Sequence, residues 1–239
     1  MRLDSLRRAY YNHWMRTYLL LLAALLAGPA PAADSKAPGA KLLAVSGDVT
    51  VKSKEGGRLG KTGSALAAGE TVETAAKATA VIELPDGSRL KLRELSSLAV
   101  TLPGPKSQVT EAFLAFGSAF AKVTKRLAGQ QFNVRTPTAV AAVRGTEFFT
   151  AYGRTRGKNR DLWVCVNEGA VELETKTAKK PLLVPAGKGV LIKSGTDLTA
   201  PQAFDWTKTL NWNMDPAAEL EDKTNLDGAY ADLLDQDYR

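Results

Sequence analysis

A hairpin pattern near the middle of the chain decides the fold class: Ile82-Glu83-Leu84-Pro85-Asp86-Gly87-Ser88-Arg89-Leu90-Lys91-Leu92-Arg93. Apolar and polar residues alternate on both sides of Asp86-Gly87, as they do in half-buried β-strands. An Asp-Gly pair between two alternating runs favours a tight turn, because glycine accepts the positive φ that such turns require. The stretch therefore predicts a β-hairpin with one buried face.

The same period of two recurs through residues 41–193, and glycine and proline punctuate it. Leu162–Val166 is apolar on both faces, which is typical of a central strand. Ala112–Lys125 is ambiguous, but Gly117 and the alternation after it favour a strand over a helix. We therefore predict one all-β domain over residues 42–195, preceded by a flexible leader at residues 33–41.

The first 32 residues read as a secretory signal. An apolar run at residues 18–27 follows Arg16 and precedes the small residues Ala30-Pro31-Ala32. This run is shorter than the roughly 20 apolar residues that cross a bilayer, and the small residues form an A-x-A cleavage site. We predict cleavage after Ala32, with Met1 or Met15 as the initiator, and a periplasmic or secreted product without a transmembrane helix. An uncleaved anchor is the alternative.

Residue usage argues against catalysis. The only histidine, His13, lies in the predicted signal peptide, so the mature chain lacks the commonest general base and metal ligand. One cysteine, Cys165, cannot form an internal disulfide or a thiolate metal site by itself. We predict no enzyme, no cofactor and no metal. The alternative is a cell-wall or polysaccharide hydrolase that uses carboxylates.

Charge is unevenly distributed along the chain. The net charge is +7, of which the first 32 residues contribute +3 and the residues from Asp215 onward −6, leaving about +10 between them. A basic body would suit nucleic acid, but an exported protein meets envelope proteins and anionic envelope polymers instead. We predict one of these as the partner. The acidic tail and the basic body either attract each other or bind complementary partners; the alternative is that the apolar residues of the tail simply pack on the domain.

One longer run resembles a known signature: Thr136-Pro137-Thr138-Ala139-Val140-Ala141-Ala142-Val143-Arg144-Gly145-Thr146-Glu147-Phe148 is similar to that of the FecR domain. Four shorter motifs occur in the order that the family shows: Val45–Val49, Ala80–Ser88, Val166–Val171 and Ala186-Gly187. The resemblance therefore covers roughly residues 42–195. It implies a twisted β-solenoid or sandwich-like array rather than a closed barrel.

The family's regulatory members sense iron-siderophore uptake across the periplasm. They carry a cytoplasmic anti-sigma segment, a membrane helix and a domain that meets a TonB-dependent transporter. This chain has a predicted signal peptide in place of the first two and little sequence after residue 195. The resemblance therefore implies a stand-alone interaction or sensing module of the bacterial envelope.

Two groups of residues are candidate interaction sites. At the bend around Gly145, Arg144, Thr146 and Glu147 form either a recognition surface or a corner of the β-fold held by a turn and an Arg144–Glu147 ion pair; we favour the corner. The basic run of Arg154, Arg156, Lys158 and Arg160 is either an anion-binding loop or a solvated hairpin tip.

After residue 195 the pattern changes. Phe204, Trp206, Leu210 and Trp212 form an aromatic cluster that we expect to cover an end or edge of the β-domain. Asp215-Pro216 is a favourable helix start, and the apolar residues that follow have helical spacing. Residues 196–239 are therefore predicted as a Trp-containing linker and a short acidic helical extension.

Overall fold

The computed structural model describes residues 39–104, 107–125, 130–153, 161–178, 180–193 and 196–225. These residues form 17 strands and one 3-10 helix, η1 (Asp205–Thr209), so the predicted all-β class is confirmed. The predicted signal peptide at residues 1–32 and the tail after Asn225 lie outside the described residues.

The strands make two layers. The first sheet pairs them in the order β4-β1-β6-β7-β9-β12-β13-β16-β17, and every pair is antiparallel. The bounds are β1 Ala40–Ser46, β4 Ala65–Leu66, β6 Thr79–Glu83, β7 Arg89–Leu92, β9 Val109–Lys122, β12 Glu147–Tyr152, β13 Leu162–Glu168, β16 Gly189–Lys193 and β17 Asp197–Leu198.

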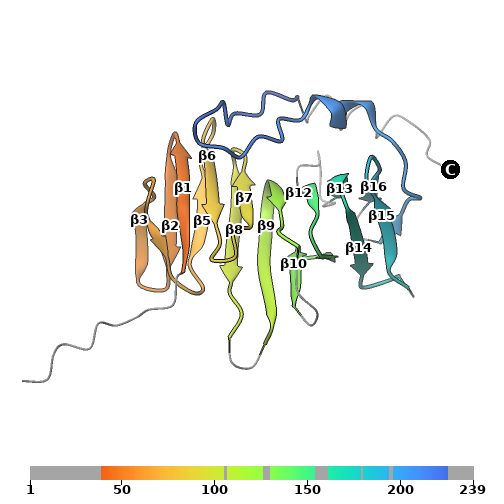
Figure 1. Cartoon of the computed structure of the whole chain (residues 1–239), viewed down its shortest axis with the longest axis horizontal. Helices are drawn as coiled ribbons and strands as arrows, with labels where there is room; N and C mark the ends of the chain where they lie inside the picture. The colour runs from red at the N-terminus through yellow and green to blue at the C-terminus, as the bar shows by residue number, and fades with distance from the viewer. Residues whose placement is uncertain are drawn as a thin grey trace, which may run out of the picture. The chain divides into compact units, whose positions relative to one another are not determined.

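The second sheet has the order β3-β2-β5-β8-β9-β10-β11-β14-β15, in which β9 and β10 alone run parallel. The bounds are β2 Val49–Ser53, β3 Gly56–Leu59, β5 Thr71–Thr74, β8 Ser96–Thr101, β10 Gln131–Arg135, β11 Ala139–Val143, β14 Ala170–Thr175 and β15 Leu182–Pro185. Figure 1 shows the strands side by side, with β9 near the middle.

Strand β9 belongs to both sheets. Its first part, up to Phe116, pairs with β8 and β10, and its last part pairs with β7 and β12. The change of sheet occurs at Gly117, which has φ +88°. The strand expected within Ala112–Lys125 is thus confirmed, and it joins the two layers at their centre.

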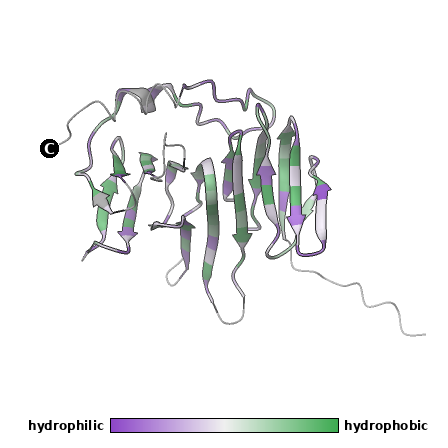
Figure 2. Cartoon of the chain, turned by 180° about the vertical axis from the view of Figure 1, so that it is seen from behind, coloured by the Kyte–Doolittle hydropathy of each residue, from purple (hydrophilic) through white to green (hydrophobic). Residues whose placement is uncertain are grey.

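The predicted hairpin is β6–β7. The two strands pair antiparallel from Ala80↔Leu92 to Glu83↔Arg89, around the Asp86-Gly87 turn. Leu90 and Leu92 face the core between the sheets, whereas Lys91 between them faces the other side. This alternation appears as colour bands along the strands in Figure 2.

The main core lies between the two sheets and is closed by side chains. Leu42, Ile82 and Leu90 of the first sheet pack with Val72 and Leu114 of the second. The expected central strand at Leu162–Val166 is β13, which lies between β12 and β16 and is buried along these residues. Aliphatic and aromatic packing therefore supplies the stability of the fold.

The chain after β17 is extended, apart from η1. The helix expected to begin at Asp215 is absent from the described residues, because residues 216 and 217 form a turn and residues 219–225 have no regular structure. Asp215 Oδ1 accepts a hydrogen bond from the Ala217 amide, so it caps a turn that does not continue as a helix. In Figure 1 this segment passes along the strands from β16 toward β6.

Candidate functional site

The signature run forms the corner at which the chain passes from the second sheet into the first. Residues 144–146 connect β11 to β12. Gly145 has φ +82°, and a Cβ there would lie 2.9 Å from Lys125 Cγ and 3.1 Å from Lys125 Cα. A side chain at this position would be both strained and crowded. The glycine therefore answers a backbone demand, which supports the corner interpretation.

Two of the candidate interaction residues are buried in this corner. Thr146 Oγ1 donates a 2.9 Å hydrogen bond to the Ala170 carbonyl. Glu147 is 5% exposed, lies 3.2 Å from Lys122 Nζ, and accepts a 2.6 Å hydrogen bond from Asn167 Nδ2. Thr146 thus joins the corner to β14, and Glu147 joins β12 to its neighbours β9 and β13.

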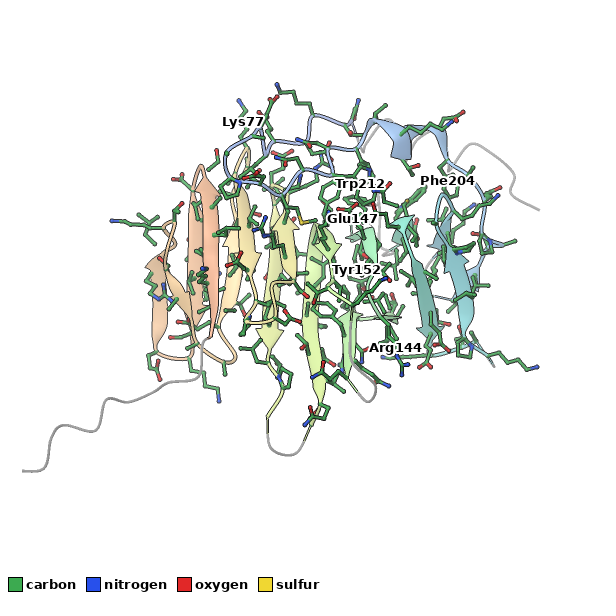
Figure 3. The ribbon with its side chains drawn as sticks, viewed as in Figure 1. Lys77, Arg144, Glu147, Tyr152, Phe204 and Trp212 are labelled. Carbon is green, nitrogen blue, oxygen red and sulfur yellow. The ribbon has the colours of Figure 1, made fainter. Side chains whose placement is uncertain are left out.

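The expected Arg144–Glu147 ion pair is not formed. Glu147 lies opposite Lys122 in the β9–β12 register, so Lys122 takes the place assigned to arginine. Arg144 is exposed, and Figure 3 shows it on a different part of the ribbon from Glu147. The partner of Glu147 comes from a distant strand, and no local sequence pattern indicates it.

The basic run of Arg154, Arg156, Lys158 and Arg160 lies outside the described residues. Its neighbours Gly153 and Asp161 follow β12 and precede β13. Arg144 precedes β12, so the corner and the ends of the basic loop lie at opposite ends of that strand. Arg144 and the two residues that flank the basic loop are therefore separated by the length of β12.

Cys165 is a core residue of β13. It is 2% exposed, and its burial raises the pKa of the thiol far above the ordinary value. A thiol in such surroundings stays protonated and is inert as a nucleophile. Cys165 therefore packs as a small apolar residue of the core.

A second functional candidate emerges on the outer face of the first sheet. Residues 199–225, here called the strap, cover this face. The strap contributes Phe204, Leu210, Trp212, Met214 and Leu220 to a cluster with these sheet residues: Ala44, Val81, Phe120, Phe149, Ala151, Trp163 and Leu191. The expectation that the aromatic segment covers the domain is confirmed for Phe204, Leu210 and Trp212, but the expected position over an end or edge is wrong, because these residues lie on a sheet face. The side chain of Trp206 lies outside the described part of the chain.

Aromatic rings anchor the strap at two places. Trp212 meets Phe120 edge-on with ring centroids 5.3 Å apart, and Phe204 meets Trp163 at 5.5 Å. Figure 3 shows Trp212 and Phe204 between the strap and the strands. Edge-to-face pairs of this kind add about 0.5–1.5 kcal/mol beyond the area they bury.

Three cations of the first sheet hold the backbone of the strap. Lys91 Nζ donates to the carbonyls of Asn211 at 2.5 Å and Asn213 at 2.7 Å. Arg93, which directly follows β7, donates through Nη2 to the carbonyls of Asp222 at 3.0 Å and Thr224 at 2.9 Å. Arg89 at the start of β7 reaches the Met214 carbonyl at 3.5 Å.

Lys91 is fully buried by the strap. Its Nζ lies 4.4 Å from the centroid of the Phe120 ring, and its side chain is 0% exposed. Desolvation lowers the pKa of Lys91 to about 8, although the negative charge of Asp222 opposes the shift. The ammonium group is thus bound to carbonyl oxygens and an aromatic ring beneath the strap.

The carboxylate of Asp222 binds the strap's own backbone. Asp222 Oδ1 accepts from the Thr224 amide at 2.8 Å, and its Oδ2 accepts from the Asn211 amide at 3.2 Å. Over residues 215–225 the contacts with the basic body run through backbone carbonyls, at Asp222 and Thr224, rather than through the carboxylate ion pairs expected of an acidic tail. The rest of the acidic tail lies outside the described residues. A pocket of about 400 Å³ lies where Lys77, Arg93 and Glu94 face residues 221–225.

Comparison with known families covers the middle of this structure. Residues 70–172 match the family model described as FecR protein. The chain contains a FecR domain. The FecR domain begins just before β5 and ends within β14, so it includes β7, β9 and the Gly145 corner. The predicted resemblance is thereby confirmed over residues 70–172, a shorter stretch than the predicted 42–195. The strap lies outside the matched residues.

Two solved structures resemble the chain, both of a candidate anti-sigma factor from Parabacteroides distasonis ATCC 8503. They have 17% and 18% sequence identity and a TM-score of 0.49 each. The match covers 58% of this chain and 63% and 62% of those chains, which is less than two thirds of their length. A search of curated proteins found no match.

Within the described residues, no helix is long and apolar enough to span a membrane.

Sequence reasoning missed the role of Lys91 and Arg93. Their alternation with Leu90 and Leu92 is also the pattern of a solvent-facing strand surface, so it does not indicate burial. The sequence did contain one signal that an outer face of the sheet is covered, namely the aromatic cluster after residue 195, because such a cluster packs on an apolar surface. Nothing in the sequence identifies β7 as the strand that holds it.

Proposed function

We propose that the protein is a non-catalytic interaction and sensing module of the bacterial envelope, which acts by binding another protein. The observation that carries the proposal is the FecR domain over residues 70–172. Regulators of this family carry such a domain in the periplasm and use it in signalling. Export of the chain to the periplasm, with cleavage after Ala32, is part of the same proposal.

The interior of the domain supports binding over catalysis. Aliphatic and aromatic side chains fill the space between the sheets. A hydrolase of the alternative kind needs a cleft with two convergent carboxyl groups. The pocket lined by Glu94, Glu221 and Asp222 comes nearest, but Glu94 accepts a 2.8 Å hydrogen bond from the Lys77 amide and Asp222 caps two amides of the strap. The carboxylates of Glu94 and Asp222 are thus used in holding loops.

We further propose that Arg144 and the basic loop with Arg154, Arg156, Lys158 and Arg160 contact the partner. Arg144 is exposed beside the buried Thr146 and Glu147, which fix the shape of the corner. An arginine there offers a planar donor group to acceptors on another protein. The corner and the loop would then contribute two separate contacts at the ends of β12.

Site-specific photo-crosslinking in cells tests the proposal. A photoreactive residue replaces Arg144 or Arg156 in the full chain, and a matched probe replaces the exposed Lys188 in the turn before β16. We expect one discrete protein adduct from Arg144 or Arg156 and none from Lys188. The proposal fails if the interaction positions give no protein adduct. Release of fragments from peptidoglycan, abolished by Glu94→Gln, would instead establish the hydrolase.

A further inference from the structure

The strap is held on the first sheet without becoming one of its strands. Among the described residues, backbone hydrogen bonds between the strap and this sheet end at Gln202, which pairs with Gly189. Beyond Gln202, the contacts come from strap side chains and from the cations of β7 and Arg93. Removal of residues 203–225 would therefore leave the described strand pairing intact.

Recognition of the strap relies on groups that every polypeptide carries. Lys91 and Arg93 together bind four backbone carbonyls, at Asn211, Asn213, Asp222 and Thr224. Carbonyl recognition is independent of side-chain identity, so selectivity is left to the sockets between Phe120, Phe149 and Trp163. A different extended segment with large apolar side chains satisfies the same requirements.

The closed position of the strap carries an internal penalty. Lys91 becomes fully buried against carbonyl oxygens and the Phe120 ring, and no ion pair of Lys91 occurs among the described residues. Removing a cation from water without a carboxylate contact opposes closure. A methionine would fill the same space without that penalty. The face therefore retains a group that favours hydration, which is unexpected beneath a permanent cover.

We propose that this face is the docking site of an extended segment of a partner protein, and that residues 203–225 occupy it in cis until the partner displaces them. The partner segment is rich in aromatic and aliphatic side chains, to fill the sockets over Phe120 and Trp163. Carboxylates flank these side chains, because Arg89, Lys91 and Arg93 make the face cationic. The inference rests on the proposed protein-binding function and assigns it a second surface, apart from Arg144 and the basic loop.

A competition assay with a defined peptide tests the displacement. The probe is a fluorescent peptide of residues 203–225, added to the full mature chain. In the double variant Leu210→Ala/Trp212→Ala the cis strap loses two anchors, while the face stays unchanged. We expect the peptide to bind this variant about tenfold tighter than the wild type, equivalent to about 1.4 kcal/mol of weakened competition.

Two controls keep this result specific. Lys208→Ala removes an exposed strap residue that pairs with Asp205, and it leaves peptide affinity at the wild-type value. A peptide carrying the same Leu210→Ala and Trp212→Ala changes binds neither protein. Equal affinity of the natural peptide for wild type and double variant would overturn the proposal, as would equal binding of the altered peptide.

Hydrogen exchange of the wild type provides a test that needs no variant. If the strap opens independently, the amides of Asn211 and Thr224, which donate to the Asp222 carboxylate, exchange faster than those of β13 at every denaturant concentration below the unfolding transition. Exchange of both segments only through global unfolding would show that the strap is a permanent cover, and would overturn the proposal.

The assay is independent of any cellular partner. Displacement of the strap by the peptide, without protein adducts in cells, would refute the proposed function and leave a face that binds only the chain's own strap. Protein adducts in cells together with a strap that never opens would refute this inference and place the partner elsewhere.

Discussion

Single residues fix this structure where the chain changes sheet. Gly145 and Gly117 both have a positive φ and both leave too little room for a side chain. At Gly117 a Cβ would lie 2.4 Å from Ser96 Cα and 2.6 Å from the Leu95 carbonyl oxygen. Such contacts with backbone atoms cannot be relieved by a side-chain rotation. These glycines are therefore required by geometry.

At the signature corner, Gly145→Val is expected to lower the free energy of unfolding by about 1–3 kcal/mol, because valine is strained at φ +82°. Arg144→Ala at the neighbouring exposed position should change it by less than about 1 kcal/mol. Urea denaturation of the two variants and the wild type decides the matter. A neutral Gly145→Val variant would show that the corner interpretation is wrong.

Lys91 gives a prediction for pH. Its pKa is lowered from 10.5 to about 8 in the folded state, so between these values the unfolded chain binds more protons than the folded chain. The free energy of unfolding therefore rises with pH in this window. Between pH 7.5 and 9.5 we expect a Lys91 contribution of about 2 kcal/mol, since one pKa unit corresponds to about 1.4 kcal/mol.

Lys91→Met removes this contribution, so the stability of the variant rises less over the same interval. The exposed Lys188→Met variant serves as the control and should follow the wild type. Urea denaturation at pH 7.5 and 9.5 measures the difference between the three proteins. Parallel pH profiles for wild type and Lys91→Met would contradict the assignment of a desolvated ammonium beneath the strap.

At the scale of elements, β9 is the strand on which both sheets depend. A substitution at its bend affects the pairs with β8 and β10 on one side and with β7 and β12 on the other. A substitution at this bend therefore affects the stability of both sheets, whereas a substitution elsewhere in a strand affects the pairing of one sheet.

Gly117→Ala should be much more destabilising than Gly187→Ala. Gly187 also has a positive φ, +73°, but no atom lies within 4 Å of the place that a Cβ would take, so alanine there meets backbone strain alone. Alanine at position 117 adds the clash with Ser96, and we expect an extra loss of at least about 2 kcal/mol. Chemical denaturation compares the two variants directly; similar losses would show that the β9 bend has room to relax.

Elements defined by local patterns were predictable from the sequence. The β6–β7 hairpin follows from alternation around Asp86-Gly87, and β13 from its apolar run at Leu162–Val166. Contacts between distant segments could not be predicted from the sequence. Neither the Glu147–Lys122 pair nor the Lys91–Asn213 contact leaves a signal in the local sequence pattern. The helix start at Asp215 failed for a related reason: tertiary contacts of the strap override local capping preference.

For the whole molecule, export remains a prediction. The apolar run at residues 18–27 and the Ala30-Pro31-Ala32 site predict a mature chain that begins at Ala33. Expression with the native N-terminus, followed by N-terminal sequencing of the envelope fraction, gives the answer. A chain that still begins at Met1 or Met15 would contradict cleavage and indicate a membrane anchor. An Ala32→Tyr change, which blocks the small-residue site, should leave the precursor uncleaved.

The shared strand β9 also gives the fold an order of assembly. When a chain emerges with its N-terminus first, β1–β8 leave both sheets with an open edge, at β7 in one and β8 in the other. Arrival of β9 closes both edges in a single event and at once offers new edges to β10 and β12. Because pairing between sequence-distant strands is slow in β-proteins, we expect the β7–β9 and β9–β12 pairings to limit the rate of folding. The C-terminal strands then build outward from β9, so the second half uses the first as its template.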